Sequence, residues 1–166
     1  LSYRKFSGKT EKKYSVHPYL LKEYRNRWYL LAWDPKMEFI RTFGCDRIQA
    51  INTDENTKFT TSSEFDSDEY FSHTVGITVI DNSPPVKVTL ECDPILARYL
   101  TSQPLHPSQK ITNRQELYTI SLNVIITYEL IQWIMGYSAE VTVKSPQSLK
   151  EILTLRLNKA LKMSTT

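Results

Sequence analysis

The sequence is poor in glycine and cysteine and has no long apolar run, and each shortage excludes a class of protein. Four glycines in 166 residues leave little room for a phosphate-binding glycine loop, and neither a P-loop nor a GxGxxG motif occurs. Cys45 and Cys92 stand far apart without a CxxC pair, which argues against a zinc site and favours reduced thiols. Without an apolar run of about 18 residues we predict no membrane span. The opening LSYRKFSGKTEKKYS lacks the apolar core of a secretory signal, so we expect a cytoplasmic protein.

Motifs that carry catalysis are also missing. The serines have no G-x-S-x-G or S-x-x-K context, and His73 and His106 have no acid or thiol partner at a characteristic spacing. The acidic run 66–69 lacks the glycine and final glutamate of a calcium loop, so a helix start explains it more simply. We therefore predict a protein that is not an enzyme and needs no metal or cofactor. An unrecognised enzyme remains the weakest alternative.

The composition is that of a globular protein, with an uneven distribution of charge. The formal net charge is +3, but residues 1–50 hold 11 Lys/Arg against 5 Asp/Glu, whereas residues 51–166 hold 10 against 13. A basic first part suggests contact with an anion. A solvated basic face explains the same asymmetry without any ligand.

The first part of the chain reads as short strands. Residues 1–6, 14–24, 27–33 and 37–51 are rich in β-branched and aromatic residues. Arg25-Asn26 and the run 34–36 are turn signals, and Gly44 indicates a bulge or bend. Short strands with close turns predict a small β-barrel over residues 1–65.

Residues 66–166 show a different pattern, in which helices alternate with strands. Asp66 lies three residues before Glu69, as at a helix start, and Pro84-Pro85 resists regular structure, so residues 66–85 should form a helix and a linker. Over residues 86–166 the strand and helix patterns follow the order βαββαβ, and a final helix ends the chain. That order predicts a ferredoxin-like α+β domain. The expected fold class is mixed, with two domains: a small β-barrel and then this α+β domain.

Four blocks in the basic part resemble a known family. They are Pro18-Tyr19, Arg27-Trp28-Tyr29-Leu30, Arg41-Thr42-Phe43 and Asp46-Arg47-Ile48. In this order and spacing they resemble the WYL domain of bacterial transcriptional regulators. Relatives often carry a glycine before the Arg-Trp-Tyr-Leu run, where this chain has Asn26, a residue that also tolerates a tight turn. The stretch from residue 86 to the last helix looks like the C-terminal extension that follows WYL domains.

The resemblance implies an Sm-like barrel that senses a ligand, commonly a nucleotide or nucleic acid. It implies a homodimer formed with help from the C-terminal extension. It also implies that operator DNA is bound only through an N-terminal helix-turn-helix domain. We find no helix-turn-helix pattern ahead of the first predicted strand. We interpret the chain as the sensing and dimerisation part of such a regulator.

The candidate ligand site combines cations with rings. Strand alternation puts Trp28 and Leu30 in the core and Arg27 and Tyr29 on the other face, where Arg41 and Phe43 could meet them. Guanidinium groups suit phosphates, and aromatic faces stack bases. The predicted ligand-binding residues are His17, Tyr19, Arg25, Arg27, Tyr29, Arg41, Phe43 and Arg47.

Blander interpretations stay open for each of these residues. Arg25 and Arg27 could pair with Glu23 or Glu38, Arg47 could pair with Asp46, and His17 could be a structural histidine. An autonomous Sm-like module that binds RNA or single-stranded DNA without regulating transcription is the main alternative function.

Overall fold

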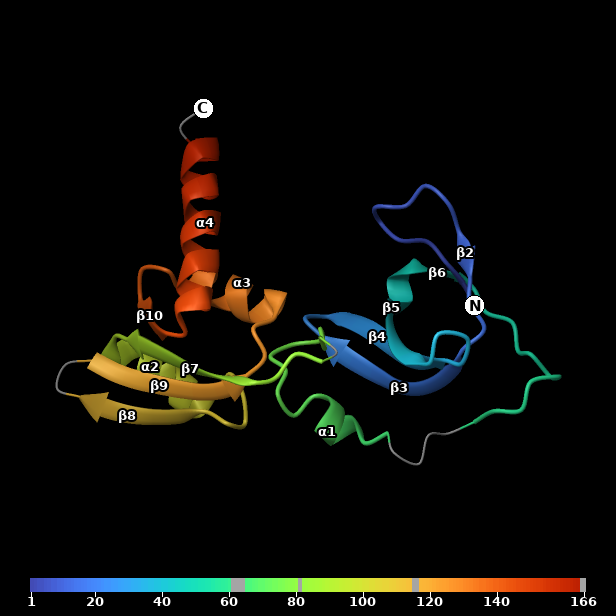
Figure 1. Cartoon of the computed structure of the whole chain (residues 1–166), viewed down its shortest axis with the longest axis horizontal. Coiled ribbons are helices and arrows are strands. Elements are labelled where there is room, and N and C mark those ends of the chain that lie inside the picture. The colour runs from blue at the N-terminus through green and yellow to red at the C-terminus, as the bar shows by residue number, and fades with distance from the viewer. Residues whose placement is uncertain (61–64, 81, 115–116, 165–166) are drawn as a thin grey trace. The chain divides into compact units, whose positions relative to one another are not determined.

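The computed structural model describes residues 1–60, 65–80, 82–114 and 117–164 (Figure 1). Two compact units make up the chain, Leu1–Ser67 and Asp68–Thr166, and each is described by itself. Parts of the predicted barrel (61–64), linker (81), hairpin (115–116) and C-terminal domain (165–166) lie outside the described residues.

The described strands of the first unit form two antiparallel sheets of three strands each. One has the order β3-β4-β5, with β3 at His17–Tyr24, β4 at Arg27–Asp34 and β5 at Phe39–Gly44. The other has the order β2-β1-β6, with β2 at Lys12–Lys13, β1 at Ser2–Tyr3 and β6 at Ile48–Ala50. The described residues therefore do not form the closed barrel that the sequence predicted. The single strand expected over 37–51 is broken by the 3-10 turn η1 (Cys45–Arg47), and β6 then pairs with β1.

Both turns predicted between the strands of the β3-β4-β5 sheet are confirmed. Tyr24 pairs with Arg27, so Arg25 and Asn26 form a two-residue turn, with φ angles of 51° and 59°. Positive φ at both positions is the geometry that matches the twist of a hairpin, and asparagine tolerates it well. At the next turn, Asp34 Oδ1 accepts hydrogen bonds from the backbone N–H groups of Lys36 (3.0 Å) and Met37 (3.2 Å).

A small aromatic core holds the first unit together. Tyr3, Ala32 and Phe43 are buried, and the rings of Tyr3 and Tyr14 meet Phe43 edge-on at 5.1 and 5.2 Å between centroids. Leu30 packs against this core as predicted, whereas the prediction for Trp28 is wrong, because its side chain is 56% exposed. Trp28 pairs with Glu23 close to the hairpin tip, beyond the reach of so small a core.

The second unit matches the predicted ferredoxin-like topology. Its antiparallel sheet has the order β10-β7-β9-β8, formed by Val141–Ser145, Val86–Cys92, Leu117–Val124 and Lys110–Arg114. Helices α2 (Pro94–Ser102), α3 (Tyr128–Gly136) and α4 (Gln147–Ser164) complete the βαββαβ order and its final helix. Asp93 caps α2 by accepting a hydrogen bond from Leu96 N at 2.8 Å.

Alternation along the central strands decides which face of this sheet is covered. Val88 and Leu90 on β7 and Ile120 and Leu122 on β9 share one core with buried leucines of all three helices, among them Leu130. Residues that alternate with them, such as Lys87, point away from that core, as a strand with one packed face requires. Within the described residues, no helix is long and apolar enough to cross a membrane.

Much of the segment expected to be a linker packs on the second unit. The short helix α1 (Ser67–Tyr70) starts directly after Asp66, as predicted. The chain then runs beside the end of β9, where Ile125 N donates to the carbonyl of His73 (2.8 Å) and Thr127 Oγ1 donates to that of Val75 (3.1 Å). Val75 is buried in the main core, so this stretch is an integral part of the domain.

Candidate ligand-binding site

The structure distributes the eight predicted site residues over several places in the first unit, and two of them line a groove. His17 and Tyr19, on β3, lie in a groove of about 1450 Å³ that Leu20, Ile48 and Phe59 also help to line. His17 is buried, and its Nδ1 accepts a hydrogen bond from Thr60 N at 3.0 Å, which leaves the proton of the neutral ring on Nε2. Tyr19 Oη donates to the carbonyl of Thr60 at 3.3 Å.

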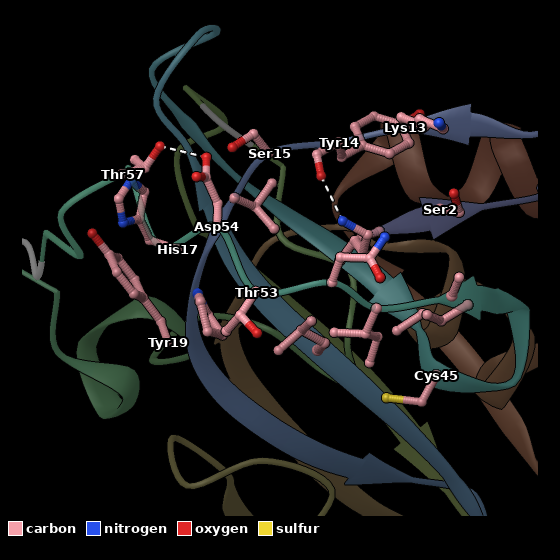
Figure 2. A pocket seen from close by; sticks show the side chains of 18 of the residues that line it. Ser2, Lys13, Tyr14, Ser15, His17, Tyr19, Cys45, Thr53, Asp54 and Thr57 are labelled. Atoms are coloured by element: carbon pink, nitrogen blue, oxygen red, sulfur yellow. Dashed lines mark hydrogen bonds between the residues drawn. The ribbon is translucent and has the colours of Figure 1, made fainter.

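The groove is nearly balanced in charge. Its charged side chains are Lys13 and Asp54, and Figure 2 shows them apart, with Asp54 close to Thr57. Asp54 is already engaged, because it accepts hydrogen bonds from Asn56 N and from Thr57 Oγ1, and these hold its pKa below the usual value. Apart from those two charges, the groove is lined by apolar side chains, hydroxyls, amides, the His17 imidazole and the Cys45 thiol. Such a lining offers little attraction to a phosphate group.

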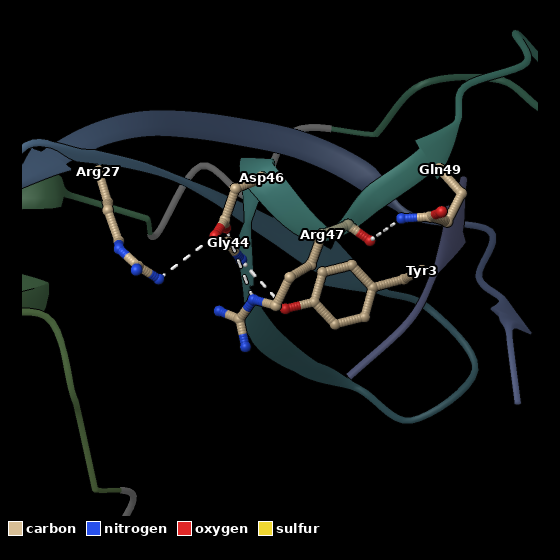
Figure 3. Close-up of polar contacts among 6 residues, drawn as sticks. All are labelled: Tyr3, Arg27, Gly44, Asp46, Arg47 and Gln49. Carbon is tan, nitrogen blue, oxygen red and sulfur yellow. Dashed lines mark hydrogen bonds and ion pairs between the residues drawn. The ribbon is translucent and has the colours of Figure 1, made fainter. Parts of the chain in front are cut away.

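Two predicted arginines meet at a single carboxylate outside the groove. Arg27 Nη1 lies 3.3 Å from Asp46 Oδ2, and Arg47 Nε lies 3.6 Å from Asp46 Oδ1 (Figure 3). Arg27 comes from β4, and the other two residues come from η1. The side chains of Arg27 and Asp46 are 54% and 42% exposed, so water competes for their ion pair.

An exposed ring lies beside both guanidinium groups. Phe6, in the loop between β1 and β2, is 74% exposed, and its ring centroid is 5.0 Å from the Arg47 guanidinium carbon and 6.0 Å from that of Arg27. Arg47 also lies over the ring of Tyr3 at 5.4 Å. Arg27, Arg47, Asp46 and Phe6 are called the arginine cluster below. They present two cations, one anion and an exposed aromatic ring at one surface.

The backbone at Gly44 makes room for this cluster. A Cβ at residue 44 would lie 2.8 Å from both Arg47 Nε and Asp46 Oδ1, closer than a side chain tolerates. Gly44 N also donates a hydrogen bond to Tyr3 Oη at 3.2 Å. Burial raises the pKa of Tyr3 despite that bond and the charge of Arg47, so this hydroxyl stays protonated at neutral pH. The glycine predicted to be a bend thus ends β5 and lets Arg47 lie against the backbone.

Arg41 is held in an ion pair of a different kind. Its Nε lies 2.5 Å from Oδ2 of Asp34, whose side chain is only 7% exposed, and its guanidinium stacks at 4.4 Å from the ring of Phe39 and 5.3 Å from that of Tyr14. Burial alone would raise the pKa of Asp34, but hydrogen bonds from Arg41, Lys36 N and Met37 N outweigh it and lower the pKa. Arg41 therefore ties β5 to the turn before it.

Strand register explains why Arg41 and Phe43 do not meet Arg27 and Tyr29. Arg41 pairs with Ala32 and Phe43 pairs with Leu30, so both lie on the face of the even-numbered residues of β4. Arg27 and Tyr29 point to the opposite face, because side chains alternate along a strand. The expectation that these four side chains converge is wrong.

The remaining predicted residues have plainer surroundings. Phe43 is a core residue with 3% exposure, and Tyr29 is half-buried on β4. Arg25 is exposed at the hairpin tip, where its guanidinium lies 5.4 Å from the ring of Tyr24. Neither Glu23 nor Glu38 holds Arg27, which pairs with Asp46, and Glu23 instead accepts a hydrogen bond from Asn26 N at 2.6 Å.

Sequence reasoning missed Phe6 as a member of the arginine cluster. The residue follows Arg4 and Lys5, and an aromatic next to a basic pair on a predicted strand was the available signal. Nothing local indicated that Phe6 would be exposed, since the strand expected over residues 1–6 shortens to Ser2–Tyr3. Thr60, which holds both His17 and Tyr19, lies 41 residues beyond Tyr19 and gave no local signal at all.

Comparison with known proteins agrees with this division into two units. Residues 1–53 match the model of the WYL domain, and residues 84–161 match the model of the WCX domain. The two matches together cover most of the chain. Residues 1–53 are therefore a WYL domain, and residues 84–161 are a WCX domain.

Among solved structures, the chain is similar to proteasome accessory factor B/C (PafBC) of Arthrobacter aurescens. The identity is 19% and the TM-score is 0.39, over 99% of this chain and 25% of that chain. The chain thus spans about a quarter of the length of that protein. No functionally curated protein matches the sequence.

Proposed function

We propose that this chain is the ligand-sensing and dimerisation region of a bacterial WYL-type transcriptional regulator, and that its ligand carries phosphate. The ligand class is a nucleotide or a single-stranded nucleic acid, and the arginine cluster is the place where it binds. One observation carries the proposal: the guanidinium groups of Arg27 and Arg47 both lie over the exposed ring of Phe6 inside the region that matches the WYL domain.

The chemistry of these three side chains fits a nucleotide. Each guanidinium presents a planar set of N–H donors that can bind phosphate oxygens in pairs. A ring with a free face can stack a base, which contributes about 1–3 kcal/mol per base in single-strand complexes. Phe6 is 74% exposed and lies within 6.0 Å of both guanidinium carbons, so a phosphate contact and a ring contact are available at one place.

Other cations of the first unit support the same surface. The backbone of Arg4 bonds to the carbonyl of Arg47, and its Nη2 donates to Gln49 Oε1 at 3.3 Å. Arg4 and Lys5 are exposed and precede Phe6 directly, so the segment adds positive charge beside the ring. Arg41 is left out of the proposed site, because its partner Asp34 is buried and its position is structural.

Regulation requires that the ligand favours one of two arrangements of the protein. A ligand shifts such an equilibrium only by the difference between its affinities for the two states. In the proposed regulator the chain forms a homodimer, and a separate DNA-binding domain contacts operator DNA. The proposal is one of binding, without turnover of the ligand.

The proposal is tested by fluorescence anisotropy with a short fluorescein-labelled oligodeoxythymidine at several salt concentrations. Binding should weaken as salt rises, and Arg27→Ala and Arg47→Ala should each reduce the slope of log affinity against log salt by about 0.7, the value for one phosphate of a single strand. Arg98→Ala, at an exposed position on α2 of the second unit, is the charge-matched control. It should leave both the affinity and its dependence on salt unchanged.

Two results would contradict the proposal. Equal affinity of Arg27→Ala, Arg47→Ala and the unchanged chain would show that the phosphate binds elsewhere. Tight binding of RNA and DNA alike, together with a monomer at every ligand concentration in sedimentation, would favour the autonomous RNA-binding module instead.

A further inference from the structure

The Asp46 carboxylate lies where an anionic ligand of the arginine cluster would have to bind. Its two oxygens are divided between two cations, with Oδ2 at 3.3 Å from Arg27 Nη1 and Oδ1 at 3.6 Å from Arg47 Nε. A phosphate bound by both arginines would place its oxygens in the same positions. Figure 3 shows Asp46 between the two guanidinium groups, with Gly44 beside it.

Both of these ion pairs are weak enough to be displaced. They are long for charge-assisted hydrogen bonds, which usually measure about 2.7–2.9 Å between nitrogen and oxygen. The Arg27–Asp46 pair is also open to water, which leaves an exposed pair with little net stability. The N–H group at Arg47 Nε is a donor that no acceptor uses, since this buried atom has no hydrogen-bond partner in the described part of the chain. The buried pair of Asp34 and Arg41, at 2.5 Å, is the contrasting case.

We infer that Asp46 is an internal competitor of the ligand. Its carboxylate occupies the arginine cluster when no ligand is bound, and a phosphate-bearing ligand displaces it to reach Arg27 and Arg47. This inference rests on the proposed function and adds a determinant of ligand choice. Asp46 repels every anion, and only a ligand that brings more negative charge or more acceptor oxygens than one carboxylate overcomes it. A phosphomonoester meets that condition, and an uncharged nucleoside gains nothing from the two arginines.

The local backbone fixes the competing carboxylate in place. Asp46 is the central residue of η1, whose turn is closed by a hydrogen bond from Ile48 N to the carbonyl of Cys45. Gly44 lacks the Cβ that would crowd both Asp46 Oδ1 and Arg47 Nε. The turn therefore keeps residue 46 close to both cations.

The test measures the affinity for a phosphate-bearing probe after the charge of Asp46 has been removed by a side chain of nearly the same shape. Asp46→Asn should tighten binding of fluorescein-labelled oligodeoxythymidine, and of AMP as its competitor, by about 5- to 30-fold at low salt, the range for one unit charge at a partly exposed site. The gain should shrink as salt screens it. Affinity for adenosine, which carries no phosphate, should not change. Asp46→Ser is the second variant with the same expectation, in case asparagine disturbs folding.

Controls separate this effect from a general change in charge. Glu55→Gln removes one negative charge from an exposed position of the same unit and should alter affinity little. Asp46→Glu restores the charge and should return the affinity towards that of the unchanged chain. Thermal unfolding of each variant verifies that the first unit is folded.

The outcomes distinguish the two levels of the argument. The competitor inference is overturned if the unchanged chain binds the oligonucleotide and the folded Asp46 variants bind it no more tightly. Weaker binding by those variants would mean that Asp46 positions the two arginines for the ligand. If neither the unchanged chain nor any Asp46 variant binds a phosphate-bearing probe, the proposed function fails and the inference fails with it. Tighter binding of adenosine as well as AMP would also overturn it, because charge would then not be the cause.

Discussion

Replacing Arg41 by alanine is expected to destabilise the first unit without weakening binding of a phosphate-bearing ligand. Arg41 donates to Asp34, which is almost fully buried, and stacks between the rings of Phe39 and Tyr14. A hydrogen bond to a charged group contributes about 1.5–3 kcal/mol, and a broken buried ion pair costs about 3–5 kcal/mol. Asp34 would keep its two backbone donors, and Arg41 is itself partly solvated, so the expected loss is about 2 kcal/mol.

That loss is large for so small a unit. A core of this size supplies only about 3–5 kcal/mol of stability, and here Tyr3, Ala32 and Phe43 are its fully buried members. Urea unfolding should be followed by tryptophan fluorescence in a Trp133→Phe background, because the remaining tryptophans, Trp28 and Trp33, both lie in the first unit. Arg25→Ala removes an exposed arginine from the same sheet and should cost less than about 0.5 kcal/mol.

The pH dependence supplies an independent check of the same ion pair. The pKa of Asp34 is lowered in the folded state, so the pair's stabilisation is present above the ordinary aspartate pKa of about 3.9 and is lost as pH falls through the lower folded value. Arg41→Ala should make this acid loss smaller. An unchanged urea midpoint in Arg41→Ala, or a loss of oligonucleotide affinity with unchanged stability, would refute the structural role and restore Arg41 to the ligand site.

Three further predictions concern the second unit. Gly76→Ala should lower its stability by about 1–3 kcal/mol in urea unfolding, because residue 76 has a φ of +97° and a Cβ there would lie 2.7 Å from Cγ of Glu129; a neutral result would show that the segment moves freely. Asp93→Ala should cost about 1 kcal/mol through loss of the bond to Leu96 N, with Asp93→Asn as the conservative control. Burial lowers the pKa of His106, so the unfolded chain takes up its proton first and stability should fall as pH drops below about 6.5. His106→Gln should remove that part of the pH dependence, and an unchanged profile would contradict it.

Local signals were sufficient for most elements of the fold. The Arg25-Asn26 turn, the cap at Asp93 and the alternation of Val88 and Leu90 depend on residues within a few positions of each other, and all were predicted correctly. The barrel was not, because closure depends on which strands pair. A turn of three residues at Cys45–Arg47 is enough to direct β6 to β1.

The candidate site was predictable in its residue types and less so in its arrangement. The WYL-like blocks identified Arg27 and Arg47, and the structure brings these two near one another through Asp46. The same blocks included Arg41, which the register assigns to a different partner on the other face of the sheet. A one-residue change in register reverses the face of every side chain, and no local pattern in this sequence revealed it.

The order of strands and helices in the second unit and the concentration of cations in the first part of the chain could be read from the sequence. These follow from periodicity, turn chemistry and composition, which act over a few neighbouring residues, whereas the likeness to WYL domains rested on four short sequence blocks. The partners of Arg27 and Arg41, and the exposure of Phe6 beside Arg27 and Arg47, depend on how distant parts of the chain pack. Arg27 and Asp46 are 19 residues apart, so their contact exists only once β4 and η1 lie next to each other. Pairing over such distances is set by packing and register, and therefore by the folded chain as a whole.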